Sequence, residues 1–148
     1  MNNWKLYSHI KTGTLWEFNS RDKSNGHSYD YHGNYIPQIA TQLFERFTKK
    51  DDIILDMFLG SGTTAIEALN MNRRCIGVEI QKKMCDYVSE KFSREALDKS
   101  VKIINGDSTT EEVKKHILAT LKGLEEEKAQ FLMLHPPYAD IIKFSDLD

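Results

Sequence analysis

Two kinds of apolar pattern alternate along this chain, and they predict strands separated by helices. Short apolar runs indicate strands at residues 53–57, 75–78, 101–104 and 130–134. Apolar residues at helical spacing predict helices over residues 36–50, 63–70, 81–97 and 109–121. Because strands and helices alternate, we predict an α/β fold built on a doubly wound, Rossmann-like parallel sheet.

The same pattern predicts helix faces and boundaries. The charged helix over residues 81–97 is expected to be continuous, and Ser108 or Thr109 is expected to cap the helix that follows. The first helix is expected to place one apolar face inward, formed by Ile36, Ile39, Leu43, Phe44 and Phe47.

The N-terminal part of the chain has no sustained periodicity. We predict an irregular segment over residues 1–30 and one domain over residues 31–148. Irregular segments of this length more often serve a function than merely connect elements.

Composition indicates an ordinary globular chain. Of the 148 residues, 40% are hydrophobic and 28% charged, and no apolar run reaches the ~20 residues that span a bilayer. With no secretory signal either, we expect a cytoplasmic protein and no membrane partner. Cys75 and Cys85 lie at no metal-ligand spacing, so we expect reduced thiols, with Cys75 buried, and no metal.

Three polar positions follow consecutive predicted strands: Asp56 with the loop containing Gly60 and Gly62, then Glu79, then Asp107. In parallel sheets, ligands bind at the carboxyl ends of strands. The loop lacks the third glycine of a dinucleotide site and the lysine of a phosphate loop, whereas Glu79 can accept both ribose hydroxyls. A ribose-containing ligand without a pyrophosphate fits best, although each residue taken alone could be an ordinary turn residue.

These motifs resemble those of S-adenosylmethionine-dependent DNA methyltransferases that modify the exocyclic amine of adenine or cytosine. The resemblance implies a class I methyltransferase fold that is incomplete at its C-terminal side, and S-adenosylmethionine as cofactor. It rests on DMFLGSGT at 56–63, GVEI at 77–80, NGDS at 105–108, HPPY at 135–138 and YHGNYIPQI at 31–39.

The resemblance also assigns cofactor-binding residues. Glu79 would bind the ribose, Ile80 would lie against the adenine, and Asp107, which Ser108 follows, would hydrogen-bond the adenine amine. The remaining residues are expected at the amino-acid end of the cofactor: Asn34, Tyr35, Pro37, Asp56, Phe58, Gly60, Ser61, Gly62 and Thr63.

The run His135, Pro136, Pro137, Tyr138 is the expected catalytic motif. Two prolines fix the backbone, so that their carbonyls can accept hydrogen bonds from a base amine, and Tyr138 can stack on a flipped base. The family usually has Asp, Asn or Ser where this chain has His135. Only a neutral imidazole accepts a hydrogen bond, so activity is expected to fall at acid pH. This departure leaves adenine and cytosine both open.

Little sequence follows Tyr138, and the resemblance implies further strands and a target-recognition region. We therefore expect the N-terminal part of a restriction-modification DNA methyltransferase, with an open sheet edge after the last strand. It would be either a fragment or one half of a split enzyme that a second polypeptide completes. The net charge of −2 agrees with a DNA surface that lies largely elsewhere. A non-catalytic cofactor-binding subunit and an RNA or protein-amide methyltransferase remain alternatives.

Overall fold

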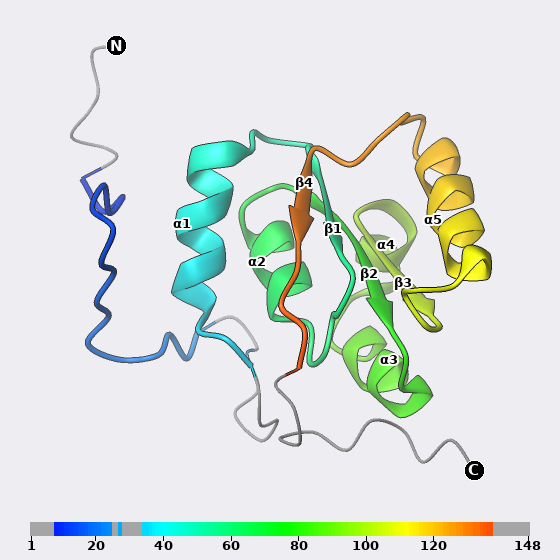
Figure 1. Cartoon of the computed structure of the whole chain (residues 1–148), viewed down its shortest axis with the longest axis horizontal. Helices are drawn as coiled ribbons and strands as arrows, with labels where there is room; N and C mark the ends of the chain where they lie inside the picture. Colours follow the sequence, from blue (N-terminus) through cyan, green and yellow to red (C-terminus); the bar gives the residue numbers. More distant parts are fainter. Residues whose placement is uncertain (1–7, 25–26, 28–33, 138–148) are drawn as a thin grey trace.

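The computed structural model describes residues 8–24, 27 and 34–137. Four parallel strands form one sheet in the order β3-β2-β1-β4 (Figure 1). The chain steps from β1 through β2 to β3 and then returns to the other side of β1, which confirms the predicted doubly wound sheet. The strands are β1 (Ile53–Asp56), β2 (Arg74–Glu79), β3 (Val101–Asn105) and β4 (Phe131–Met133).

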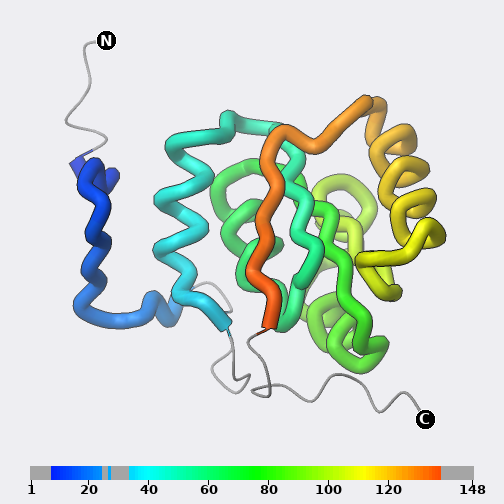
Figure 2. Tube along the Cα trace, viewed as in Figure 1, coloured from blue at the N-terminus to red at the C-terminus, as the bar shows by residue number. Residues whose placement is uncertain are grey.

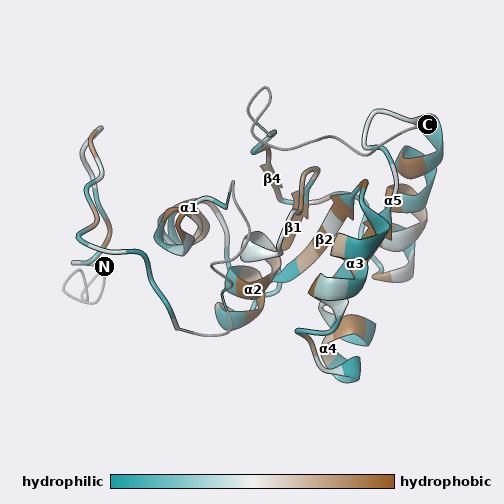
Figure 3. Cartoon of the chain, turned by 90° about the horizontal axis from the view of Figure 1, so that it is seen from below, coloured by the Kyte–Doolittle hydropathy of each residue, from teal (hydrophilic) through white to brown (hydrophobic). Residues whose placement is uncertain are grey.

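Helices cover the two faces of the sheet unequally. In Figure 3, which looks along the strands, α5 lies on one face and the other helices gather on the opposite one. The helices are α1 (Pro37–Phe47), α2 (Thr63–Asn70), α3 (Lys82–Ser89), α4 (Arg94–Lys99) and α5 (Glu111–Gly123).

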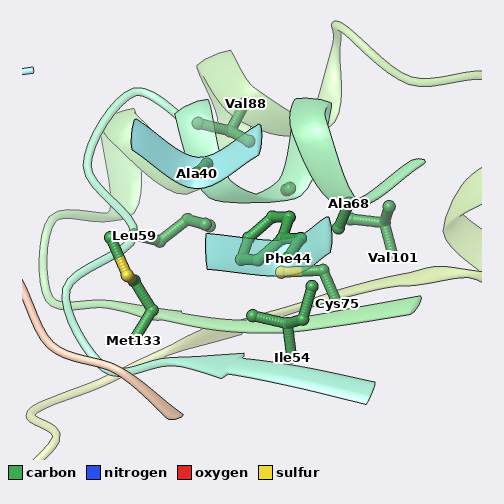
Figure 4. Packing of buried hydrophobic residues seen from close by; sticks show 10 residues of the cluster. Ala40, Phe44, Ile54, Leu59, Ala68, Cys75, Val88, Val101 and Met133 are labelled. Atoms are coloured by element: carbon green, nitrogen blue, oxygen red, sulfur yellow. The ribbon is translucent and has the colours of Figure 1, made fainter. Parts of the chain in front are cut away.

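Successive residues of β1 point to opposite faces and enter two separate cores. Ile53 packs with the apolar side of α5, whereas Ile54 packs with α1, α2 and α3. Figure 4 shows the second core, where Phe44 of α1 lies over Ile54 and Cys75. Cys75 is a free, fully buried thiol, as predicted.

The structure corrects the expected helix over residues 81–97. It is two helices, because the backbone leaves the helix after Glu90 and Ser93 starts α4 by accepting a hydrogen bond from the Ala96 N–H. The apolar spacing continues through this break, so periodicity alone could not reveal it.

Two further helix predictions were wrong in detail. Thr110, rather than Ser108 or Thr109, caps α5 by accepting a hydrogen bond from the Val113 N–H. The first helix does not bury Phe47, which is 62% exposed and stacks on Phe131. Small Ala40 is fully buried instead, and α1 packs mainly against α2.

The N-terminal segment over residues 8–24 runs along the outer side of α1, as the blue part of Figure 2 shows. Buried Gln42 holds it there: its Oε1 accepts from the Lys11 N–H and its Nε2 donates to the His9 carbonyl. The segment contains no helix or strand within these residues. Among the residues described, no helix has the length and apolar character to cross a membrane.

Candidate functional site

The glycine loop after β1 lies directly on the end of β2. Leu59 packs against Gly77 so closely that an added Cβ there would meet Leu59 Cδ1 at 2.6 Å. The Leu59 N–H also donates to the Val78 carbonyl at 2.8 Å. A residue without a side chain at position 77 therefore lets the loop fold over the sheet edge.

Gly62 forms the junction between this loop and α2. Its φ of +86° is left-handed, and an added Cβ would meet Val88 Cγ1 of α3 at 2.7 Å. Among the described residues no side chain caps α2, so its first backbone N–H groups have no side-chain acceptor there. Such a helix end suits a negatively charged ligand group. Thr63, the first residue of α2, and Ser61 of the loop are both buried.

Glu79 ends β2 and ties the loops together. Its carboxylate accepts the Gly60 N–H at Oε2 and the Gln81 N–H at Oε1, both at 2.9 Å. The side chain is only 8% exposed. These two hydrogen bonds hold Glu79, the residue predicted to bind the ribose, beside the glycine loop. Each carboxylate oxygen can still accept a further hydrogen bond.

Asp56 lies deeper, at the end of β1, and is 1% exposed. Its Oδ1 accepts the Phe58 N–H at 2.9 Å, and Thr64 supplies a side-chain hydrogen bond. Burial raises the pKa of Asp56 to about 6, and the charge of Glu79 adds to the rise, while both hydrogen bonds oppose it. This residue is better placed to shape the loop than to meet a ligand at the surface.

Asp107 follows β3 at the same sheet edge but is exposed. Its Oδ1 accepts the backbone N–H of Thr109 at 2.9 Å and the Thr109 hydroxyl at 2.8 Å. These hydrogen bonds lower the pKa of Asp107. Asp107 therefore acts as a turn residue in the structure, one of the two alternatives that the sequence left open, and Ser108 lies in the same turn.

Two apolar side chains stand exposed beside these polar groups. Phe58 follows β1 and is 37% exposed, and Ile80 follows β2 and is 38% exposed. Large apolar residues at the surface next to a polar site are typical of a surface that contacts a ligand ring.

The stretch before α1 joins the glycine loop. Asn34 Oδ1 accepts the Ser61 hydroxyl at 2.5 Å, and the Tyr35 hydroxyl lies 2.7 Å from Thr64 Oγ1. Pro37 is buried at the first position of α1. The structure thus brings the predicted N-terminal residues to the site.

The expected catalytic motif follows β4, beside that stretch. His135 is half-buried, and its ring meets the Tyr35 ring edge-on with centroids 5.3 Å apart. Burial lowers the pKa of His135, so the imidazole is neutral at pH 7. Pro136 is exposed, Pro137 is half-buried, and Tyr138 lies outside the described residues.

Thr64 is the site residue that sequence reasoning missed. It is fully buried and joins Asp56 to Tyr35. A polar residue within an otherwise apolar inward helix pattern was the available signal, because a buried hydroxyl needs a partner.

Comparison with known proteins agrees with this geometry. A family model described as DNA methylase (N6_N4_Mtase) matches residues 3–90. The chain is 34% identical over 100 residues to the probable type III restriction-modification enzyme HindVI Mod subunit of Haemophilus influenzae, a match that covers 66% of this chain and 12% of that protein.

Two type II methyltransferases are also similar. M.MjaII of Methanocaldococcus jannaschii is 33% identical over 76 residues, covering 51% of this chain and 14% of that protein. M.BglI of Bacillus subtilis is 32% identical over 119 residues, covering 77% of this chain and 32% of that protein. The chain therefore spans a third or less of the length of these three relatives.

Proposed function

The chain belongs to the N6/N4 family of DNA methylases, and from this membership we propose that it forms the cofactor-binding and amine-binding part of a DNA methyltransferase. The substrate would be the exocyclic amine of adenine or cytosine, in a restriction-modification setting like that named for the Haemophilus influenzae relative. One observation carries the proposal: the Glu79 carboxylate and the glycine loop are joined at one strand end by the Gly60 hydrogen bond.

The residues present fit S-adenosylmethionine. Glu79 is rigid, buried and able to accept ribose hydroxyls, while the uncapped start of α2 suits the carboxylate of the amino-acid end. Exposed Ile80 offers apolar surface to the adenine, and exposed Phe58 offers apolar surface to the amino-acid end. Asp107, with Ser108 in its turn, would accept from the adenine amine.

The remaining contacts lie at the amino-acid end of the cofactor. The backbone of the loop would surround this end, and the stretch before α1 would cover it. We propose these residues there: Asn34, Tyr35, Pro37, Gly60, Ser61, Gly62 and Thr63. Buried Asp56 would act through the loop, whose backbone it holds.

S-Adenosylmethionine, when bound, supplies an electrophilic methyl group. The amine lone pair is delocalised into the base, so the protein must localise it by accepting hydrogen bonds from the amine N–H groups. The neutral His135 ring and the carbonyl at Pro136 would accept them, while Pro137 keeps the backbone rigid. We propose that Tyr138 stacks on the base after it leaves the helix.

Transfer of a labelled methyl group to unmethylated DNA tests the proposal, followed by identification of the methylated base. The chain is assayed alone and with any polypeptide encoded beside it, because further strands and the recognition surface are proposed to lie outside these residues. Cofactor binding without any methyl incorporation in either assay would overturn the enzymatic proposal and favour a non-catalytic subunit.

Two variants of His135 separate its chemistry from its bulk. His135→Leu removes the acceptor and should lower methyl transfer about 100-fold or more, with little change in cofactor binding. His135→Asn keeps an acceptor oxygen that does not titrate, so it should retain much of the activity.

The pH profile gives a second test of the same group. Because burial lowers the pKa of His135 below its usual 6.5, wild-type activity should fall only as the pH drops below ~6.5. The His135→Asn variant should lack this acid limb. An identical acid limb in both proteins would show that another group controls it.

A further inference from the structure

The contact between Tyr35 and His135 joins two segments that are distant in sequence. The ring centroids lie 5.3 Å apart with an interplanar angle of 62°, an edge-on arrangement that is favourable for aromatic rings. His135 comes after β4, which pairs only with β1 among the described strands. The Tyr35 ring therefore supports His135 at a position where the sheet itself gives support on one side only.

The other end of Tyr35 is anchored in the cofactor side of the site. Its hydroxyl lies 2.7 Å from Thr64 Oγ1, and Thr64 hydrogen-bonds Asp56. An ionised carboxylate can only accept, so Thr64 donates to Asp56 and Tyr35 donates to Thr64. Burial, reinforced by the charge of Asp56, raises the pKa of Tyr35, which keeps the phenol protonated as this chain of hydrogen bonds requires.

The backbone around Tyr35 is held as well. The Asn34 side chain accepts a hydrogen bond from the Ser61 hydroxyl at 2.5 Å. The Asn34 backbone carbonyl accepts one from Arg21 Nη1 at 3.0 Å. Buried Pro37 follows, and it restricts the preceding residue to an extended conformation. Tyr35 thus extends from a fixed stretch of backbone toward two different parts of the site.

We propose that Tyr35 is a positioning residue: it holds the His135 imidazole in place through its ring, and Thr64 and Asp56 anchor it to the glycine loop. The inference deepens the proposed function, since it takes His135 as the acceptor for the amine. It assigns Tyr35 a task beyond covering the cofactor, because the same side chain links the loop after β1 to the motif after β4.

The first test needs neither cofactor nor DNA. In the wild-type chain with isotope-labelled histidine, nuclear Overhauser contacts should join the Tyr35 ring protons to the His135 ring protons. The His135 signal is assigned by its loss in His135→Gln. Absence of these contacts in the folded wild-type protein would overturn the proposal.

Variants extend this test to the His135 environment. Tyr35→Leu should move the His135 ring signal and raise its pKa toward 6.5, because the ring that shields it is gone, whereas Tyr35→Phe keeps the ring and should change both less. Tyr87→Leu, at a half-exposed tyrosine of α3, is the matched control. A Tyr35→Leu spectrum that matches the control at His135 would contradict the proposal. Unchanged signals from the other histidines establish that the variant is folded.

Kinetics separate positioning from cofactor contact. If Tyr35 positions His135, Tyr35→Leu should lower kcat about 10- to 100-fold in addition to any change in the KM for S-adenosylmethionine, and Tyr35→Phe should restore most of kcat. A rise in KM with kcat unchanged would instead make Tyr35 a plain cofactor contact and overturn the positioning role. Absence of methyl transfer in the wild type would count against the proposed function, while the spectroscopic tests still decide the contact.

Discussion

The two halves of the site are supported in different ways. On the cofactor side, backbone N–H groups of the loops bind Glu79 and Asp56, and both carboxylates are buried. On the amine side, His135 is half-buried next to exposed Pro136, at the end of a strand paired on one side by the described residues. One half is therefore rigid through its own loops, whereas the other depends on segments packed against it.

Gly62→Ala should break the rigid half most severely. The left-handed φ strains any residue with a side chain, and the new Cβ would meet Val88, so we expect a loss of about 2–5 kcal/mol in the free energy of unfolding. Gly123→Ala is the control, since nothing lies within 4 Å of its added Cβ and alanine favours the helix by about 0.5–1 kcal/mol. Urea denaturation measures both. Equal stability of the two variants would show that the loop tolerates a side chain.

Glu79→Gln tests whether the carboxylate organises the loop and binds the cofactor. The amide oxygen can replace only one of the two carboxylate oxygens, so one of the two backbone N–H groups, of Gly60 or Gln81, would face the amide NH2 group, which is itself a donor. We expect a dissociation constant for S-adenosylmethionine that is about 10- to 100-fold higher, as hydrogen bonds to charged groups are worth about 1.5–3 kcal/mol. Calorimetry measures it, with exposed Glu127→Gln as control. Unchanged affinity would remove Glu79 from the proposed ribose site.

Asp56→Asn should change how stability depends on pH. The raised pKa of about 6 means that the folded state holds the proton more tightly than the unfolded state. Asp56 therefore stabilises the wild type below its ordinary pKa of 3.8 and progressively loses this contribution as the pH rises to about 6, by about 1–3 kcal/mol in total. The variant should lack this loss, so its free energy of unfolding relative to the wild type should be higher near pH 8 than at low pH. Urea unfolding over this pH range measures the difference.

Asp107→Asn is the matched control for Asp56→Asn, because the two carboxylates change the free energy of unfolding with pH in opposite directions. Hydrogen bonds from Thr109 lower the pKa of Asp107, so its contribution is present above the ordinary value of 3.8 and lost as the pH falls through the lowered pKa. The same pH dependence in wild type and Asp56→Asn would contradict the assignment of a buried carboxylate with a raised pKa.

Leu132→Glu addresses the amine side and should have the smallest effect on stability, within about 0.5 kcal/mol, because Leu132 is 52% exposed. If the outer edge of β4 promotes association, the charge should reduce self-association in analytical ultracentrifugation. Leu118→Glu, at a 54% exposed position of α5, is the control and should leave association unchanged. A wild-type chain that stays monomeric at high concentration would show that the outer edge of β4 does not promote association.

Much of the fold follows from local patterns in the sequence. The four strands of the described part lie where apolar runs predicted them, because residues covered on both faces must be apolar. The predictions failed where packing chose between similar options. The break at Ser93 lies within continuous helical spacing. Helix α1 buries small Ala40 and leaves Phe47 exposed, which depends on what packs against each position of the helix.

The site divides along the same line. The sequence by itself determined the glycine loop and the carboxylates after β1, β2 and β3, because these positions follow from strand ends and backbone conformation, which are local properties. Only the tertiary structure decided that Asp56 is buried and that Thr64, Tyr35 and His135 meet. These contacts join segments far apart in the chain, and their geometry depends on how α1, α2 and β4 pack together, which no local pattern specifies.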